Sequence, residues 1–404
     1  MKLISLSVLG LILVSMVSGQ VSSTTTTPHA KMSSTTTLKI YTYESLMQDV
    51  YYNIEGNFSA FTGINVSITR FSDANQLVTE LKSGAKPDIV IGIDNALINM
   101  FNASDYFVQF DNASVLQNIN PTLIQNLDPS HYLVPYDYGV IALTYLNQVV
   151  NSSTYPFLTN NFTFNDLLNS NLASKIILEN PKISSTGLGF LLSTIATYGD
   201  NSSGITGVLG KDWKPFWENV GKKITITDSW NSALAAFNDS TNGFPVMVSY
   251  LTDPAYNYCL YNDTSTSSVI TTLSNGTQSG WFQIEGLGIV KNSPHLTAAN
   301  EFMSWFLGKD LQEHIPESQW MFPSNTLATI PSCFTQAGIP NLNAIVPLND
   351  YLSTANLKTY MSTWINEWEQ VNVTKNIPGF KLPIITLVVS FLAVITISRR
   401  KRKI

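Results

Sequence analysis

Short apolar strands alternate with helices along most of this chain, and this alternation constrains the fold more than any other feature. The first group contains predicted strands over 38–43, 66–70 and 87–92 and predicted helices over 51–61 and 74–82. The last of these strands is continuously apolar, as in a sheet that is buried on both faces. Strands separated by helices at this spacing predict βαβ units and therefore the α/β class.

The same rhythm returns in a second group of elements. Strands are predicted over 175–178, 224–226 and 244–250, with helices over 189–198 and 231–237. The pattern then becomes helical from 296 to 311 and again over 352–369.

Two further segments connect the groups. Residues 134–143 form a long β-rich run, and 286–290 read as a strand that returns. Two α/β lobes joined by two crossing strands predict a hinged, two-lobed binding protein. We expect a discontinuous first lobe, 38–140 with 286–372, and a second lobe, 141–285.

The two ends of the chain predict an exported protein that is tethered to a membrane. Lys2 precedes an apolar run and two small residues, which is the order of a secretory signal peptide. Near the other end, a short apolar segment is followed by basic residues, which predicts a transmembrane helix with a cytoplasmic C-terminus. The expected terminal segments are a signal peptide (1–19), a Ser/Thr-rich linker (20–37), a second linker (373–381), a transmembrane anchor (382–398) and a basic tail (399–404). Pro378-Gly379-Phe380, before the anchor, resembles a C-terminal sorting signal of archaeal surface proteins.

Asparagine sequons agree with an exterior location, because N-x-[ST] is modified only in chains that reach a glycosylation machinery. An Asn-, Ser- and Thr-rich chain also produces some of them by chance, but their wide spread favours glycosylation. They lie at Asn57, Asn65, Asn102, Asn112, Asn151, Asn161, Asn201, Asn238, Asn262, Asn275 and Asn372.

The charge of the chain argues against nucleic acid as a partner. There are 22 Lys and Arg against 28 Asp and Glu, for a net charge of −6. Five of the basic residues fall in 399–403, so the body is more acidic than the total. Nucleic-acid affinity comes from Lys and Arg that neutralise phosphates, whereas an acidic body suits a cationic small ligand.

The chain has two cysteines, Cys259 and Cys333. In an exported protein they can form one disulfide, and two separate thiols are the alternative.

Ligand sites in open α/β sheets lie beyond the carboxyl ends of strands. The residues that follow the predicted strands are rich in aromatics, hydroxyls and acids and contain no histidine: 43–45, 93–95, 181–187, 228–230 and 250–256. The four histidines of the chain have no metal-ligand spacing, and no nucleotide fingerprint is complete. We therefore expect no cofactor and no metal.

At these positions the chain resembles the thiamine-binding proteins of bacterial and archaeal ABC importers, a cluster of type II periplasmic binding proteins. The resemblance spans roughly 38–372 and implies two lobes, each a helix-flanked mixed sheet. The Thr-rich leader, the C-terminal anchor and the cysteines depart from it. The matching stretches are 41–45, 87–95, 134–139, 184–189, 249–250 with 254–256, and 315–323.

The resemblance implies a thiamine ligand and a role for each matching residue. Tyr43, Tyr256 and Trp320 should flank the rings, because a flat cation suits aromatic faces. Asp94 should face the cation or the amino group; its alternative role is a cap for the helix that follows.

A second set of residues is expected near the other end of thiamine, its hydroxyethyl arm. Those that precede a helix can hold a phosphate on the hydroxyethyl arm, because a helix N-terminus suits an anion, with a plain N-cap as the alternative. The set comprises Ser184, Ser185, Thr186 and Gly187 before the helix, with Trp230 and Tyr250 near the same arm. Asp137, on the crossing run, is equally compatible with a hinge role and a place beside the ligand.

The implied partners are thiamine or its phosphate esters, an ABC permease and its cytoplasmic ATPase. Two alternatives remain at this point. The first is a receptor for another cationic or metal solute, such as a polyamine or an iron complex. The second is a thiamine-cleaving transferase of the same fold with Cys259 as the nucleophile, although no His or Lys lies near it in sequence.

Overall fold

The computed structural model describes residues 36–48, 51–159, 161–239 and 243–371. The expected signal peptide, most of the 20–37 linker, the anchor, the basic tail and the sequon at Asn372 lie outside these residues. Within the described part of the chain, no helix is both long and apolar enough to cross a membrane.

The strands are short, apart from two long ones near the middle and in the last third of the chain. Their bounds are β1 Thr37–Tyr43, β2 Asn65–Phe71, β3 Ile89–Asp94, β4 Phe107–Val108, β5 Val134–Leu146, β6 Ile176–Glu179, β7 Thr225–Thr227, β8 Val246–Tyr250, β9 Thr266–Val269, β10 Thr271–Thr272, β11 Gln278–Gly280, β12 Phe282–Val290, β13 Phe322–Pro323 and β14 Val346–Pro347.

The helices fall between these strands and after them. Their bounds are α1 Ile54–Thr62, α2 Ala74–Lys82, α3 Ala103–Tyr106, α4 Ala113–Leu116, α5 Pro121–Leu127, α6 Phe164–Asn169, α7 Ser185–Tyr198, α8 Lys214–Val220, α9 Trp230–Phe237, α10 Asp253–Tyr261, α11 Leu296–Phe306, α12 Lys309–Gln312, α13 Ile315–Ser318, α14 Ser332–Gln336 and α15 Thr354–Val371. Short 3₁₀ turns occur as well, among them η1 Leu97–Met100.

One sheet runs through the whole molecule in the order β2-β1-β3-β12-β5-β8-β6-β7. β1 pairs in parallel with β2 and β3, and β6 pairs in parallel with β7 and β8. β12 is antiparallel to both of its main neighbours, β3 and β5. Each end of the sheet is therefore mixed and flanked by helices, which confirms the predicted α/β class.

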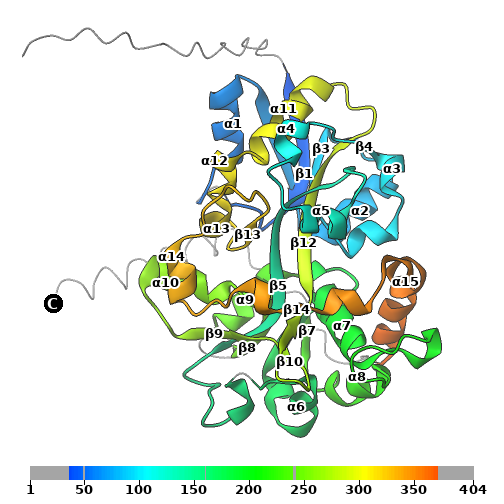
Figure 1. Cartoon of the computed structure of the whole chain (residues 1–404), viewed down its shortest axis with the longest axis vertical. Helices are drawn as coiled ribbons and strands as arrows, with labels where there is room; N and C mark the ends of the chain where they lie inside the picture. The colour runs from blue at the N-terminus through cyan, green and yellow to red at the C-terminus, as the bar shows by residue number, and fades with distance from the viewer. Residues whose placement is uncertain (1–35, 49–50, 160, 240–242, 372–404) are drawn as a thin grey trace, which may run out of the picture.

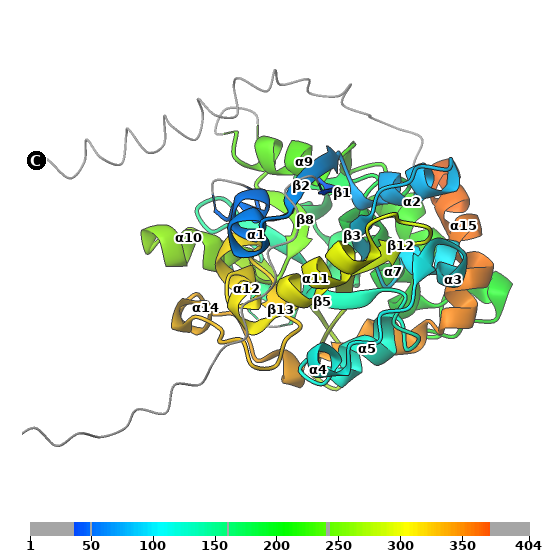
Figure 2. The ribbon, with the colours of Figure 1, turned by 90° about the horizontal axis from the view of Figure 1, so that it is seen from above.

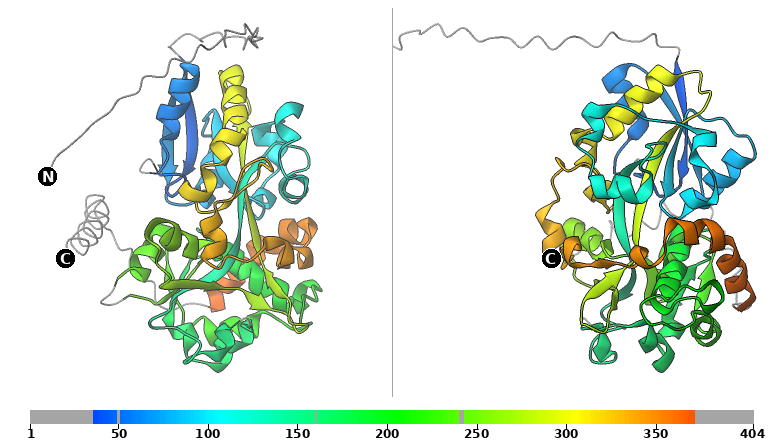
Figure 3. Two further views of the ribbon diagram at one scale, coloured as in Figure 1. Left: turned by 60° about the vertical axis from the view of Figure 1, so that its left-hand side comes forward. Right: turned by 45° about the vertical axis from the view of Figure 1, so that its right-hand side comes forward.

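β5 and β12 lie side by side and cross the waist of the molecule (Figure 1). Above them, the first lobe contains β1–β4, β13, α1–α5 and α11–α13. Below them, the second lobe contains β6–β11, β14, α6–α10, α14 and α15. Two further views show a lobe at each end of the two strands (Figure 3). The two predicted crossing runs are confirmed as parts of these strands, and both strands are longer than predicted.

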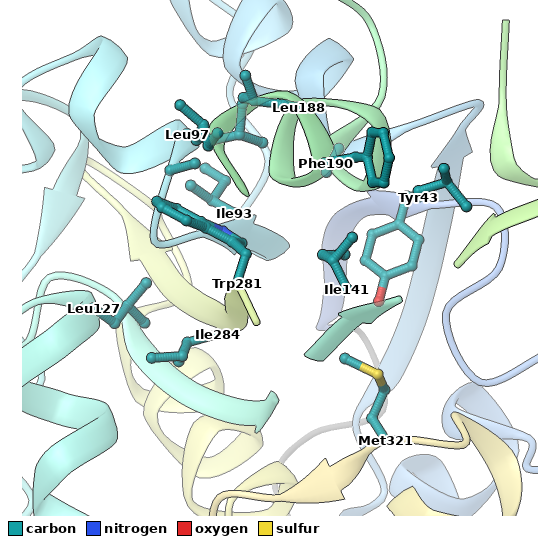
Figure 4. Packing of buried hydrophobic residues seen from close by; sticks show 14 of the residues in the cluster. Tyr43, Ile93, Leu97, Leu127, Ile141, Leu188, Phe190, Trp281, Ile284 and Met321 are labelled. Atoms are coloured by element: carbon teal, nitrogen blue, oxygen red, sulfur yellow. The ribbon is translucent and has the colours of Figure 1, made fainter. Parts of the chain in front are cut away.

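A continuous apolar core extends through both lobes. It includes Ile93 of β3 and Leu97 of η1 from the first lobe, and Leu188 and Phe190 of α7 from the second. Figure 4 shows these side chains around the crossing strands, with Ile141 of β5 among them. Burial of such apolar surface is the main favourable term in folding. The shared core keeps the lobes closely apposed at the waist.

The C-terminal part of the chain packs differently from the expected division, which assigned 286–372 to the first lobe. Helix α15 lies against α8, and its Trp364 Nε1 donates to Asp200 Oδ2 at 2.8 Å. The helix also contacts η1 of the first lobe, at the edge of the molecule where the lobes meet (Figures 1 and 2). Two tryptophans of α15 have partners in the second lobe, because Trp368 also meets Trp217 of α8 edge to face, with ring centroids 5.8 Å apart.

A disulfide joins Cys259 of α10 to Cys333 of α14. The two residues are 74 positions apart in the sequence. The chain has no other cysteines. The bond attaches the segment that follows β13 to the second lobe.

Two predicted helix starts differ from the structure, and both differences concern the site described below. The first helix begins at Ile54 because Asn53 caps it, with Oδ1 accepting from Gly56 N at 2.7 Å. Tyr51 therefore precedes the helix. The helix predicted from 189 begins at Ser185, so that Ser185, Thr186 and Gly187 form its first turn.

Candidate ligand-binding site

A cavity of about 210 Å³ lies between the lobes, with the crossing strands on one side. Seven of the ten residues that the resemblance assigns to the ligand line it. These are Tyr43, Ser185, Thr186, Trp230, Tyr250, Tyr256 and Trp320. Since the residues come from both lobes, a ligand in the cavity contacts both at once.

Three aromatic rings form one wall of the cavity. Trp320 meets Tyr256 edge to face, with ring centroids 5.1 Å apart, and meets Tyr51 at 6.5 Å. The Tyr51 hydroxyl donates to the Tyr256 hydroxyl at 3.2 Å. Tyr256 belongs to the second lobe and the other two to the first, so the wall is assembled across the cleft.

Trp320 carries two signs of a functional position. Its φ of 60° is in the left-handed region, which is unfavourable for a bulky side chain. Its indole Nε1 is buried and has no hydrogen-bond partner among the described residues. Strain of this kind is concentrated at ligand sites, where the surrounding structure holds it.

The floor of the cavity is a hydrogen-bond network centred on Glu285 of β12. Its Oε2 accepts from the Tyr43 hydroxyl and, at 2.5 Å, from the Tyr136 hydroxyl. Its Oε1 accepts from Gln283 Nε2 at 2.9 Å, and the same amide donates to the Tyr250 hydroxyl. The network fixes Tyr43 and Tyr250 in place.

A carboxylate of the first lobe caps a helix of the second. Asp73 Oδ1 accepts from the backbone N–H of Ser185, the first residue of α7, at 3.1 Å. The same oxygen accepts from Ala74 N at 2.7 Å, so Asp73 also caps α2. A negative charge is favourable at the positive end of a helix. This bond holds the lobes in a closed arrangement.

Nearby, the Asn75 side chain donates to the Lys182 carbonyl oxygen at 3.0 Å. This is a further hydrogen bond between the lobes.

Asp94 does not line the cavity, contrary to the expectation that it faces the ligand. Its Oδ1 accepts from Ala96 N at 2.8 Å and from Leu97 N at 2.7 Å. Asp94 therefore takes its alternative role as the cap of the turn after β3. Burial raises the pKa of this carboxyl to about 7.

Ser184 and Gly187 also lie behind the cavity wall. The Ser184 hydroxyl bonds to the Thr186 hydroxyl at 2.9 Å. A Cβ on Gly187 would lie 2.1 Å from the Glu179 carbonyl oxygen. Gly187 therefore lets α7 pack closely on β6, which is a structural role.

On the second lobe, Trp230 Nε1 donates to Ser249 Oγ at 2.9 Å. Asp253 Oδ2 accepts from Thr144 Oγ1 at 2.9 Å, below the same part of the cavity. These bonds fix the Trp230 indole and the Asp253 carboxylate in the part of the cavity lining that the second lobe supplies.

The cavity carries only acidic titratable side chains besides its tyrosines. Asp73, Asp253 and Glu285 line it, and no Lys, Arg or His does so among the described residues. Burial raises the pKa of Asp73 to about 7 and that of Asp253 to about 6. Carboxylates and aromatic faces without a basic side chain suit a flat, positively charged ligand.

The sequence reasoning did not identify several residues of the site. Gln319, whose Nε2 donates to the Tyr43 hydroxyl at 2.8 Å, and Tyr51 were not expected there. Asp73 follows β2, so the rule about carboxyl ends would have found it had it been applied to that strand. Gln283 and Glu285 precede the predicted start of their strand.

A cavity between two mixed α/β lobes on crossing strands defines a two-lobed solute-binding protein of the type II periplasmic class. The chain belongs to the family of bacterial extracellular solute-binding proteins, whose family model matches residues 42–313.

Similar proteins agree with this assignment. A thiamine-binding periplasmic protein of Brucella suis is 27% identical over 82% of this chain and 91% of its own length. A protein of the same name from Escherichia coli is 24% identical over 82% and 92%. A solved periplasmic thiamin binding protein has the same fold, with a TM-score of 0.68 at 22% identity, covering 84% of this chain and 96% of that one.

Proposed function

We propose that this protein is a receptor for thiamine, which it captures between its lobes. The observation that carries the proposal is the cavity lined by the Trp320 and Tyr256 rings and by carboxylates, with no basic side chain in the described lining. Thiamine joins a permanently cationic thiazolium to an aminopyrimidine, so both of its rings are flat. Each aromatic contact with such a cation contributes ~0.5–2 kcal/mol. The names of the similar proteins support the same ligand.

Binding requires the closed state, because only then do both lobes reach one ligand. Tyr43 and Trp320 come from the first lobe, and Trp230 and Tyr256 come from the second. A ligand that contacts both lobes shifts the population towards closure. We propose that the loaded, closed protein delivers thiamine to an ABC permease, whose ATPase drives import.

We propose that thiamine without a phosphate is the preferred ligand. We propose that its hydroxyethyl arm lies near Ser185 and Thr186, a position supported by their place in the cavity lining at the start of α7. A phosphate on that arm would compete with Asp73 for the Ser185 N–H. The phosphate esters therefore belong in every titration as separate ligands.

We propose an exterior location with a C-terminal membrane tether at 382–398 and a secretory signal at 1–19. The sequons support exposure to a glycosylation machinery, since none of the ten within the described residues is buried. Asn238 lies at the edge of the cavity, so a glycan there would stand at its mouth.

A thiamine-cleaving transferase is not favoured. Its nucleophile would be Cys259, but this residue is bonded to Cys333. A disulfide sulfur is not the thiolate that such an attack needs.

Intrinsic tryptophan fluorescence tests the proposal, because Trp230 and Trp320 both line the cavity. The purified protein is titrated with thiamine, its monophosphate, its diphosphate, spermidine and ferric ion. We expect a saturable change with thiamine. Saturation with spermidine or ferric ion and no response to any thiamine species would contradict the proposal.

A further inference from the structure

Two carboxyl groups face each other on the crossing strands. Asp137 of β5 and Glu285 of β12 are direct partners in the strand register. Asp137 is 0% exposed and Glu285 is 4% exposed. Glu285 lines the cavity, whereas Asp137 lies behind it. The pair therefore sits at the waist, on the two strands that connect the lobes and next to the ligand site.

The two carboxyls have very different surroundings. Glu285 accepts from Tyr43, Tyr136 and Gln283, so both of its oxygens have donors. Among the described residues, no N–H or hydroxyl group donates to either oxygen of Asp137, and its polar neighbour is the carboxyl of Glu285. A buried carboxylate without hydrogen-bond donors is strongly unfavourable. Burial raises the pKa of Glu285 as well, but its donors lower it, so the negative charge is more stable on Glu285 than on Asp137.

Within the described part of the chain, no positive charge compensates the pair. The titratable groups around it are Tyr43 on β1, Asp94 on β3, Tyr136 on β5 and Tyr250 on β8, and all of them are acids. Burial, and next the Glu285 charge, raises the pKa of Asp137 well above its usual range. Like charges this close in a buried site do not both ionise.

We propose that the Asp137–Glu285 pair holds one proton between its two carboxyls and that this proton is on Asp137. Glu285 then presents one fixed negative charge to the cationic ligand. Glu285 is then a specificity-determining residue that selects ligands by charge. Asp137 is a positioning residue that acts through Glu285. The identity of the ligand rests on the proposed function, but the sharing of the proton does not.

Infrared spectroscopy of the ligand-free protein tests the shared proton. A buried, protonated carboxylic acid gives a C=O stretching band at neutral pH. We expect D137N to remove a band that remains in E218Q, a matched control on the exposed Glu218 of α8. If the D137N and wild-type spectra are the same in this region, Asp137 is ionised and the proposal is wrong.

Calorimetric titration tests the role of Glu285 with thiamine and with thiochrome, its neutral oxidised analogue. We expect E285Q to weaken thiamine binding by at least about 10-fold and thiochrome binding by less than about 2-fold. D137N should weaken thiamine binding less than E285Q does. Equal losses for both ligands in E285Q, or a larger loss in D137N, would overturn the assignment.

The two tests separate this inference from the proposed function. If wild-type protein binds no thiamine species, the proposed function fails whatever the infrared band shows. If wild-type protein binds thiamine and E285Q binds it equally well, only the inference fails. Thermal unfolding of each variant checks that a loss of thiamine binding does not come from a loss of folded protein.

Discussion

The carboxylate of Asp73 in the first lobe accepts a hydrogen bond from the backbone N–H of Ser185 in the second, at 3.1 Å. One carboxylate thus caps its own helix and the helix across the cleft. The closed state depends on a contact that breaks when the lobes separate, so it can be tested by removing a single charge.

The variant D73N should bind thiamine about 10-fold more weakly, because it loses a carboxylate from the cavity and weakens the cap on α7, worth about 1 kcal/mol. Affinity is measured by calorimetry. The matched control is N53A, which removes the cap of α1 without touching the second lobe. N53A should lower the free energy of unfolding by an amount similar to that for D73N and leave thiamine affinity unchanged. Equal affinity losses in both variants would rule out the interlobe role.

The variant W320A should weaken thiamine binding at least about 10-fold, or about 1.4 kcal/mol, since it removes one face of the aromatic wall. It should not destabilise the protein as much as a core Trp-to-Ala change, because the Trp320 side chain is only half-buried. The control Y351A removes an exposed ring distant in sequence and absent from the cavity lining. If W320A binds as wild type does, the aromatic wall is not the ligand site.

Thiamine affinity should rise between pH 5 and pH 8. Burial raises the pKa of Asp73 to about 7 and that of Asp253 to about 6, so both carboxyls gain their charge in this range. The cation binds the ionised forms more strongly. Titrations at fixed ionic strength give the profile, and an affinity that is flat or falls with pH would contradict it.

The stability of the ligand-free protein should change in the opposite direction. An acid whose pKa is higher in the folded than in the unfolded state retains its proton on folding. Stability therefore falls as the pH rises from about 4 to about 7. Thermal unfolding without ligand should show a higher melting temperature at pH 5 than at pH 8 from these groups. The D73N variant should show a smaller pH dependence, and an unchanged slope would exclude Asp73 as its source.

Replacing both cysteines by serine should cost about 4 kcal/mol of stability, as expected for a closed loop of this length. The bond also attaches α14 to α10, the helix that carries Tyr256. Phe334 of α14 and Trp320 belong to one apolar cluster. We therefore expect a weaker, not abolished, thiamine affinity below the melting temperature. Chemical denaturation and calorimetry give the two values. A stability equal to wild type would show that the bond is not formed in solution.

Much of the fold follows from local patterns in the sequence. The helix predicted over 74–82 has the same bounds in the structure, because Asp73 caps its start and Gly84 follows its end. The crossing strands follow from their apolar runs. The packing of α15 on the second lobe could not be predicted, because periodicity shows that a helix has an apolar face but not which lobe covers it.

Site residues could be predicted where they end a strand. They were harder to predict where the side-chain rotamer determines which group the side chain contacts. Asp94 ends β3 as expected, yet its carboxylate turns to the nearest N–H groups of its own loop. Glu285 was missed because its strand was predicted to begin at Gly286. The alternation of Phe282, Gln283, Ile284 and Glu285 was the available signal, with polar side chains facing a cavity.

A crystal structure of the protein with saturating thiamine tests the central claim most directly. We predict thiamine density in the cavity, with one ring against Trp320 and Tyr256 and with Glu285 and Asp73 among its neighbours. A cavity without thiamine at saturation, or thiamine bound elsewhere on the molecule, would contradict the account.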